Sequence, residues 1–325
     1  MKITPQFIGT FETNVQTFIV DAWKRAQEDG LFWDEFMDVR PSATLRELYF
    51  WLIETARIYP ENLGGNKRYD DIAATFYEID NQNSGSALRL TKNEIEDNMM
   101  AAGGMRGMPA MDYAANWAKQ IGGAAAYWPQ QQLISLIGSG KTRNGYDEVP
   151  FFSQKHPVNP VSGTGPTYSN LLAGLKLDAT NLQLSAANLN TAAAAMRSLK
   201  QPNGAMRFLR PNVLLHAPSE SYVVNQLLDS KFFNASDNVF TRLGIQPVCA
   251  DELSGEPGVW YMGARMIPGE GGAFIYQERE PYALTTYTSD QQLELQRRKE
   301  FEWLYDGRNA AAFGHPYLFH RIEPV

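Results

Sequence analysis

The sequence is poor in cysteine: Cys249 is the single one among 325 residues. One cysteine cannot form an internal disulfide, so a reducing compartment such as a bacterial cytoplasm is the expected setting. Because Cys249 follows Pro247 and Val248 in an apolar segment, we interpret it as a small buried strand residue and not as a catalytic thiol.

Long hydrophobic runs are also missing. No segment approaches the roughly 18 uninterrupted apolar residues that a membrane-spanning helix needs. The residues from Met1 to Pro5 lack the apolar core of a secretory signal peptide. We therefore expect a soluble protein that makes no membrane contact and is not secreted by that route.

Positive charge is in short supply, since 29 Lys and Arg stand against 36 Asp and Glu, giving a net charge of -7 and a pI of about 5.3. Dedicated nucleic-acid binders usually carry a basic face and a high pI, so the composition argues against that class while leaving a local basic patch open. Hydrophobic residues make up 44% of the chain, which argues for a sizeable core, in one large domain or two, and against disorder.

Residues 138–142 (Gly-Ser-Gly-Lys-Thr) imitate the end of a phosphate-binding P-loop. The full motif needs a glycine where Ser135 stands, and it opens a helix after a strand. Here the residues close a predicted helix instead. We therefore interpret Gly138 and Gly140 as a helix stop.

Histidine is scarce, and the four present show no metal-binding spacing: His156, His216, His315 and His320. Without a cysteine cluster, a structural metal site of the ordinary type is not expected. Ser153, His156 and Asp147 offer a Ser-His-Asp set, but any chain of this length offers such combinations, and a Gly-x-Ser-x-Gly nucleophile elbow is absent. The sequence predicts no catalytic residue, no cofactor and no metal.

A short basic run, Arg297, Arg298 and Lys299, lies in a predicted C-terminal strand, with Arg308 beyond it. These charges fit a solvated strand face that pairs with Glu294, Glu300 and Glu302. A more specific interpretation is that these basic residues form salt bridges with another subunit. The run is too short and too mixed in charge for specific DNA readout.

The N-terminal segment predicts an amphipathic helix. Thr13 and Gln16 have capping-box spacing, and Gly30 ends the pattern. Apolar residues follow at helical period on one face: Val15, Phe18, Ile19, Ala22 and Ala26. The apolar run in 45–59 fits either a strand or a short helix.

Residues 69–79 and 87–91 predict two strands joined by a loop of turn formers, Asn81 to Ser86. Paired, they would make a long hairpin, which is marginal in water without a neighbour to pack on. We expect its apolar side chains to lie on another chain: Ile72, Phe76, Ile79, Leu88 and Leu90.

The middle of the chain predicts a long helix over 109–138, which Pro129 should kink or split. A loop-rich stretch from Lys141 to Asn170 is long enough to suggest an interface. An α/β block follows, with a helix from a Ser185 cap to Lys200 and a second from Pro218. Short strands are predicted at 213–215, 245–248, 259–262 and 273–276.

The C-terminal stretch 282–322 predicts β structure. A long strand over 293–305 should turn at Asp306 and Gly307, a strong two-residue hairpin signal, and return over 309–313.

Several short motifs occur together in a fixed order. The first part carries Tyr49-Phe50-Trp51-Leu52, Tyr69-Asp70-Asp71-Ile72 and Glu94-Ile95-Glu96-Asp97; the middle carries Gly145-Tyr146-Asp147, Phe151-Phe152-Ser153, His156-Pro157-Val158 and Ser169-Asn170-Leu171; the end carries Phe301-Glu302-Trp303, Asp306-Gly307-Arg308-Asn309 and Phe313-Gly314. In order and spacing, nearly the whole chain resembles the phage Mu-like major head subunit family. Glu148 departs from the glycine that members often carry there, and 230–280 carries no recognised motif.

The resemblance implies an α+β fold, the Hong Kong 97-type phage capsid fold. Its parts would be an N-terminal arm at 1–45, an extended loop (a β-hairpin) at 46–95, a peripheral domain with a spine helix at 96–180 and 285–325, and an axial domain at 181–284. The family has no catalytic residues, so no enzyme activity is implied.

The implied function is that of a major capsid protein, which forms an icosahedral virion shell of hexamers and pentamers around double-stranded DNA contacted without sequence preference. Portal, scaffolding and decoration proteins are the implied partners, and the bacterial host cytoplasm is the implied place of assembly. Two alternatives stay open: the shell subunit of an encapsulin-type nanocompartment, and an α/β enzyme with an unrecognised site.

Overall fold

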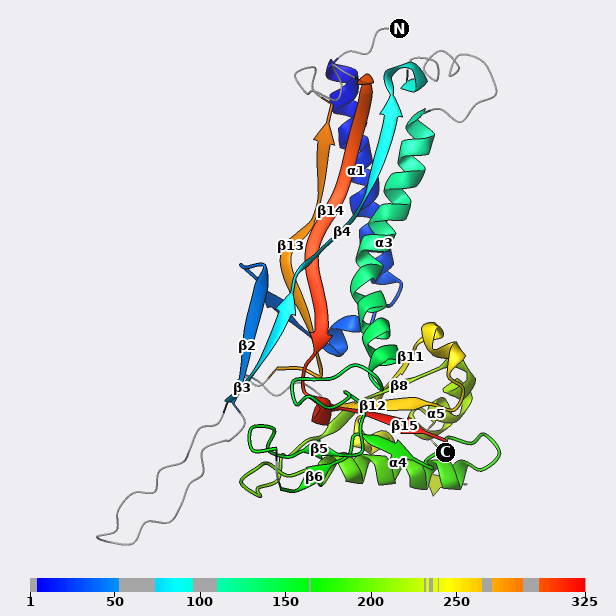
Figure 1. Cartoon of the computed structure of the whole chain (residues 1–325). Coiled ribbons are helices and arrows are strands. Elements are labelled where there is room, and N and C mark those ends of the chain that lie inside the picture. Colours follow the sequence, from blue (N-terminus) through cyan, green and yellow to red (C-terminus); the bar gives the residue numbers. More distant parts are fainter. Residues whose placement is uncertain are drawn as a thin grey trace, which may run out of the picture.

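The computed structural model describes residues 5–52, 74–95, 110–163, 165–230, 232–233, 236–238, 240–264, 271–288 and 298–324. Figure 1 shows an elongated upper part, made of two long helices beside a long sheet, above a compact lower body built on a second sheet. The helices of the upper part are α1 (Pro5–Glu28) and α3 (Ala110–Ser139).

The upper sheet has four strands in the order β1-β13-β14-β4, and only β1 and β13 run parallel. Their bounds are β1 (Met37–Pro41), β13 (Phe274–Tyr287), β14 (Glu300–Phe313) and β4 (Gln82–Thr91). Burial alternates along most of β14, as expected for a sheet with one covered face. Side chains from α1, α3, β4 and β14 form one apolar cluster under the helices, including Phe11, Val15, Ile19, Ala118, Leu88, Leu90, Phe301 and Trp303.

The lower sheet has five strands in the order β11-β8-β12-β15-β7. Their bounds are β11 (Gln246–Cys249), β8 (Pro211–His216), β12 (Trp260–Ala264), β15 (Phe319–Glu323) and β7 (Leu171–Ala173). The helices α4 (Leu182–Arg197) and α5 (Ser221–Leu228) contribute their buried faces to the core of this body.

The remaining elements are short. They are the hairpin of β2 (Arg46–Leu52) and β3 (Ala74–Asp80), the two-residue strands β5 (His156–Pro157), β6 (Thr167–Tyr168), β9 (Phe232–Phe233) and β10 (Ser236–Asp237), and the 3-10 turns η1 (Trp33–Glu35), η2 (Pro218–Glu220), η3 (Phe240–Leu243), η4 (Asp251–Gly255) and η5 (Pro316–Leu318).

The N-terminal helix is confirmed, but its predicted cap is wrong. Thr13 lies inside α1, where its hydroxyl donates to the carbonyl of Gly9. Val15 and Ile19 face inward as predicted. They pack within the chain itself, and the rings of Phe11 and Trp303 lie 5.1 Å apart. The chain itself therefore covers this part of the apolar face of the helix.

The predicted hairpin of 69–79 with 87–91 is also wrong. β3 pairs with β2, whereas β4 continues the chain after Asn81 and pairs with β14. The predicted loop tip lies within this ladder, with Ser84 opposite Gly307. Ile79, Leu88 and Leu90 are buried in the chain's own clusters, while Ile72 lies outside the described residues.

A further correction concerns Asp306 and Gly307, which lie inside β14 and make no turn. Close packing explains the glycine, because a Cβ on Gly307 would lie 3.1 Å from the carbonyl oxygen of Glu280 and from the ring of Tyr282. The pairing of β13 with β14 shifts register at this point. Glycine here permits close approach of a bulged strand.

The long predicted helix is confirmed as α3, which runs through Pro129 without being split. In α4 the side chain of Asn181, and not Ser185, caps the first turn. The limits of arm, extended loop, peripheral and axial domains remain predictions. β13 crosses the predicted limit at residue 284, and β15 joins the sheet of the lower body.

Candidate functional site

The structure brings together two of the three residues of the candidate catalytic set. His156 Nδ1 lies 2.6 Å from Asp147 Oδ2, and both side chains are buried. Ser153 does not complete the set, because its hydroxyl accepts a hydrogen bond from the backbone N–H of Lys155. The second ring nitrogen of His156 instead lies 3.0 Å from Asn170 Oδ1.

Asn170 shows what this buried group does. Its amide nitrogen donates to the backbone carbonyls of Phe151, Pro316 and Phe319, while its oxygen accepts from the backbone N–H of Ser153. The network ties the loop region 141–170 to the C-terminal strand β15. It holds the fold together and presents no exposed nucleophile. In the sequence, Asn170 was part of a motif shared with the resembled family, but its place beside His156 was not predicted.

The residues that imitate a P-loop also have structural contacts. Lys141 Nζ forms a 2.9 Å ion pair with Glu323, and a Cβ on Gly140 would lie 2.5 Å from the ring of Phe152. The residues close α3, as the helix-stop interpretation predicts.

Cys249 is exposed at the end of β11, so the expectation of a buried residue is wrong. β11 is an edge strand, which leaves its side chains more accessible than those of the central strands. Within the described ranges, no group of three or more His, Cys, Asp or Glu could hold a metal ion.

Part of the basic run lies outside the described residues, namely Arg297 together with its expected partner Glu294. Lys299 does not lie in the strand as expected, because it has a positive φ of 55° just before β14 begins. Glu300 forms an ion pair with Arg89 of β4 at 3.5 Å.

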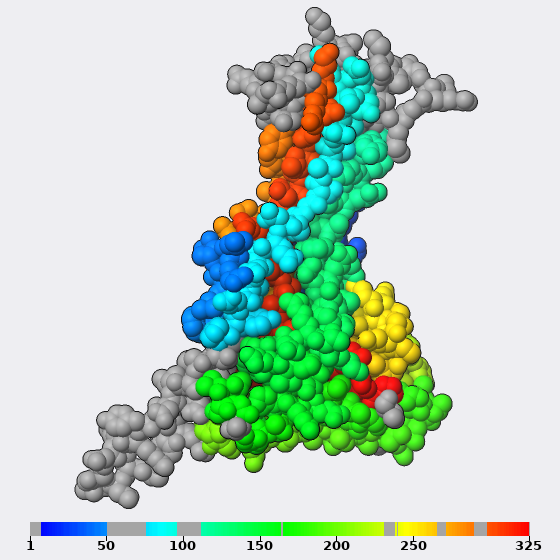
Figure 2. Space-filling model, viewed as in Figure 1, coloured from blue at the N-terminus to red at the C-terminus, as the bar shows by residue number. Residues whose placement is uncertain are grey.

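The clearest candidate contact surface is the β2–β3 hairpin, which stands out from the side of the molecule in Figure 2. Phe50 and Phe76 lie directly opposite each other across the two strands. Their exposed fractions are 66% and 63%, and Leu48 beside them is 42% exposed. Aromatic side chains are enriched at the centres of protein interfaces, so we call Leu48, Phe50 and Phe76 the hairpin patch.

The opposite face of the hairpin anchors it to the upper sheet. The hydroxyl of Tyr49 donates to Gln277 Oε1 at 2.8 Å, and Gln277 Nε2 donates to Asn81 Oδ1 at 2.7 Å. Burial raises the pKa of Tyr49 to about 12, so its hydroxyl keeps its proton. These buried contacts fix which face of the hairpin points outward.

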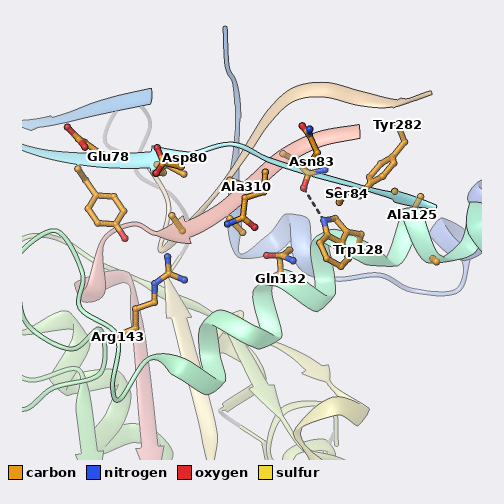
Figure 3. A pocket seen from close by; sticks show the side chains of 18 of the residues that line it. Glu78, Asp80, Asn83, Ser84, Ala125, Trp128, Gln132, Arg143, Tyr282 and Ala310 are labelled. Atoms are coloured by element: carbon orange, nitrogen blue, oxygen red, sulfur yellow. Dashed lines mark hydrogen bonds between the residues drawn. The ribbon is translucent and has the colours of Figure 1, made fainter. Parts of the chain in front are cut away.

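A groove of about 720 Å³ lies between α3 and the β3–β4 segment. Figure 3 shows Trp128 and Gln132 on the helix side and Asn83 and Ser84 on the strand side. Trp128 donates to Asn309 across it at 2.9 Å. The charged side chains of Glu78, Asp80 and Arg143 also line the groove, so its walls are mixed in polarity.

A family model described as Mu-like prophage major head subunit gpT matches residues 10–179, which is more than half of the chain. The chain belongs to this family. A second model, described as phage capsid protein, matches residues 153–317. Together the two matches extend over both the upper part and the lower body of this head subunit family member.

The major capsid protein of Escherichia phage Mu is 25% identical over 171 residues, which are 51% of this chain and 49% of that protein. The chain thus spans about half the length of the curated relative it matches. None of the helices that the structure describes is long and apolar enough to span a bilayer.

Two solved structures share the fold of this head subunit family member. The procapsid of bacteriophage JBD30 aligns with a TM-score of 0.53 and 21% identity, covering 98% of this chain and 75% of its own. A virus-like particle from Pyrococcus furiosus aligns with a TM-score of 0.53 and 10% identity, covering 96% of this chain and 98% of its own. The predicted α+β capsid fold is confirmed.

Proposed function

We propose that the chain is a major capsid protein that self-assembles into the icosahedral head shell of a tailed phage and encloses its double-stranded DNA. The observation that carries this proposal is the pair of family matches to head and capsid proteins over residues 10–317. No catalytic activity belongs to this role, and the protein resides in the virion after assembly in the bacterial host cytoplasm.

The partners in this proposal are further copies of the chain, arranged in hexamers and pentamers, together with portal, scaffolding and decoration proteins. The hairpin patch supports self-association, because two large aromatic side chains are held outward by a buried hydrogen-bond network. Each copy would lay this patch on a neighbour, a head-to-tail contact that closes into rings when repeated.

A second candidate is a shell that encloses proteins, as in an encapsulin-type nanocompartment. The fold shared with the virus-like particle from Pyrococcus furiosus favours this candidate. A shared fold is weaker support than a family match, because one fold can serve several functions. The family matches favour the phage head. An α/β enzyme is the weakest alternative, because the buried Asp147–His156 pair has no exposed nucleophile beside it.

Electron microscopy and light scattering of the purified protein test the proposal. Closed shells or hexamers are the expected result, and nuclease-resistant DNA inside shells isolated from infected cells distinguishes a phage head from a protein-filled compartment. A protein that stays monomeric at high concentration in several salts and pH values would contradict it.

A further inference from the structure

One stretch of this acidic chain carries only positive charge. Residues 179–219 contain Arg197, Lys200, Arg207 and Arg210 and no aspartate or glutamate, although the whole chain has a net charge of -7. The stretch forms α4, the connection after it and β8, and α4 lies at the lower edge of the molecule in Figure 1.

Three arginines converge on a hollow of about 220 Å³ in this part of the lower body. Arg197 ends α4, Arg210 directly precedes β8, and Arg242 comes from the separate turn η3. Apolar side chains complete the hollow: Ala193, Pro211, Leu243 and Ile245.

None of the three guanidinium groups forms an ion pair with a side chain that the structure describes, and all three are exposed. Other arginines of the chain do have carboxylate partners, including Arg40 with Asp38 and Arg46 with Asp80. Arg197 alone has an ordinary explanation, since a cation in the last turn of a helix interacts favourably with the helix dipole. That explanation does not extend to Arg210 and Arg242, which come from outside α4.

We propose that this arginine pocket, formed by Arg197, Arg210 and Arg242, binds a phosphate group. Guanidinium forks match the oxygens of phosphate and bind them bidentately. A single carboxylate from another chain would offset only one of three positive charges, whereas a nucleic-acid backbone supplies consecutive phosphates. Lys200 and Arg207 extend the positive charge along the same connection. The DNA backbone as the source of the phosphate rests on the proposed function; inorganic phosphate is the other source of the same chemistry.

The test replaces all three arginines in one variant, Arg197→Gln, Arg210→Gln and Arg242→Gln. A matched control removes the same charge elsewhere, at the exposed residues Lys24, Arg25 and Lys155, each changed to Gln. Binding of subunits to a DNA duplex of about 30 base pairs is measured by fluorescence anisotropy at several salt concentrations. The melting temperature of each variant is measured in inorganic phosphate and, for comparison, in chloride.

If the pocket holds the DNA backbone, the pocket variant loses affinity and its salt slope falls by about 2–3, whereas the control changes little. If inorganic phosphate is also a ligand, it raises the melting temperature of wild type and control but not of the pocket variant. Equal weakening in both variants, or unchanged affinity and phosphate response in the pocket variant, would overturn the proposal.

Electron microscopy of the same samples separates this proposal from the proposed function. Shells that form normally from a pocket variant with weakened DNA binding support the phosphate site. Shells that fail to form while DNA binding by subunits is unchanged would assign the pocket to a carboxylate of a neighbouring copy and overturn the phosphate site. Wild-type protein that forms no shell contradicts the proposed function but leaves the binding result standing.

Discussion

Replacing Phe76 by alanine should weaken association between subunits while leaving the subunit folded. Phe76 is 63% exposed and lies opposite Phe50 on β2. A phenylalanine side chain offers about 200 Å² to a partner, so about 125 Å² of it remains for a neighbouring chain to cover. At about 25 cal/mol per Å² that area is worth roughly 3 kcal/mol.

Truncation to alanine retains the Cβ, so the expected loss is about 2 kcal/mol per contact, or roughly 30-fold in the association constant. Within the subunit, Phe76→Ala removes only an exposed cross-strand pair with Phe50, which costs about 0.2–1 kcal/mol. Assembly should therefore need a higher protein concentration, measured by light scattering and microscopy, while the melting curve of the subunit changes little.

Phe76→Tyr is the matched control, because it keeps the ring and its apolar faces, and it should assemble at concentrations close to those of wild type. Two results would refute the reasoning. One is that Phe76→Ala shells form as readily as those of wild type, and the other is that the variant subunit unfolds outright, which would place Phe76 in the subunit's own core.

Three further predictions concern the subunit alone. His320 is buried with no hydrogen-bond partner among the residues that the structure describes, and burial lowers its pKa from 6.5 to about 3. Between pH 6.5 and about 3 only the unfolded chain takes up the proton, so wild type should lose about 1.4 kcal/mol of stability for each pH unit of acidification. Denaturant titrations should show a smaller loss per pH unit for His320→Met and His320→Gln. An unchanged pH dependence in both variants would exclude His320 as the cause. Tyr49→Phe leaves Gln277 Oε1 without its donor and should cost about 1–3 kcal/mol in urea unfolding, and a neutral result would argue against this anchor. Gly307→Ala should destabilise by about 1–3 kcal/mol, whereas Gly123→Ala in open space on α3 should stabilise by up to about 1 kcal/mol, and equal melting temperatures would contradict the packing argument.

Local periodicity predicted the helices well, because the buried faces of α1 and α4 repeat at helical spacing. It failed where pairing between distant segments overrode a local signal. Asp306 and Gly307 look like a turn, yet β4 and β13 pair with β14 on both sides of them and keep the strand extended. The strand partners of β3 and β4 were likewise decided by residues more than 20 positions away.

The candidate surfaces show the same limit. Spacing found Asp147 and His156, nine residues apart, but could not show that Asn170 would occupy the place of a nucleophile. In the run around Phe50, aromatic residues stand at successive positions, so the sequence alone could not decide which ones face outward. The arginine pocket joins residues from three segments, which only the folded chain brings together.

A cryo-electron microscopy map of the assembled protein tests the central claim most directly. The proposed function predicts a closed shell in which the hairpin patch of each copy, Leu48, Phe50 and Phe76, is covered by a neighbouring copy of the chain. A shell in which Phe50 and Phe76 point into solvent on every copy would contradict the assigned contact surface, and a protein that forms no shell at all would contradict the proposed function itself.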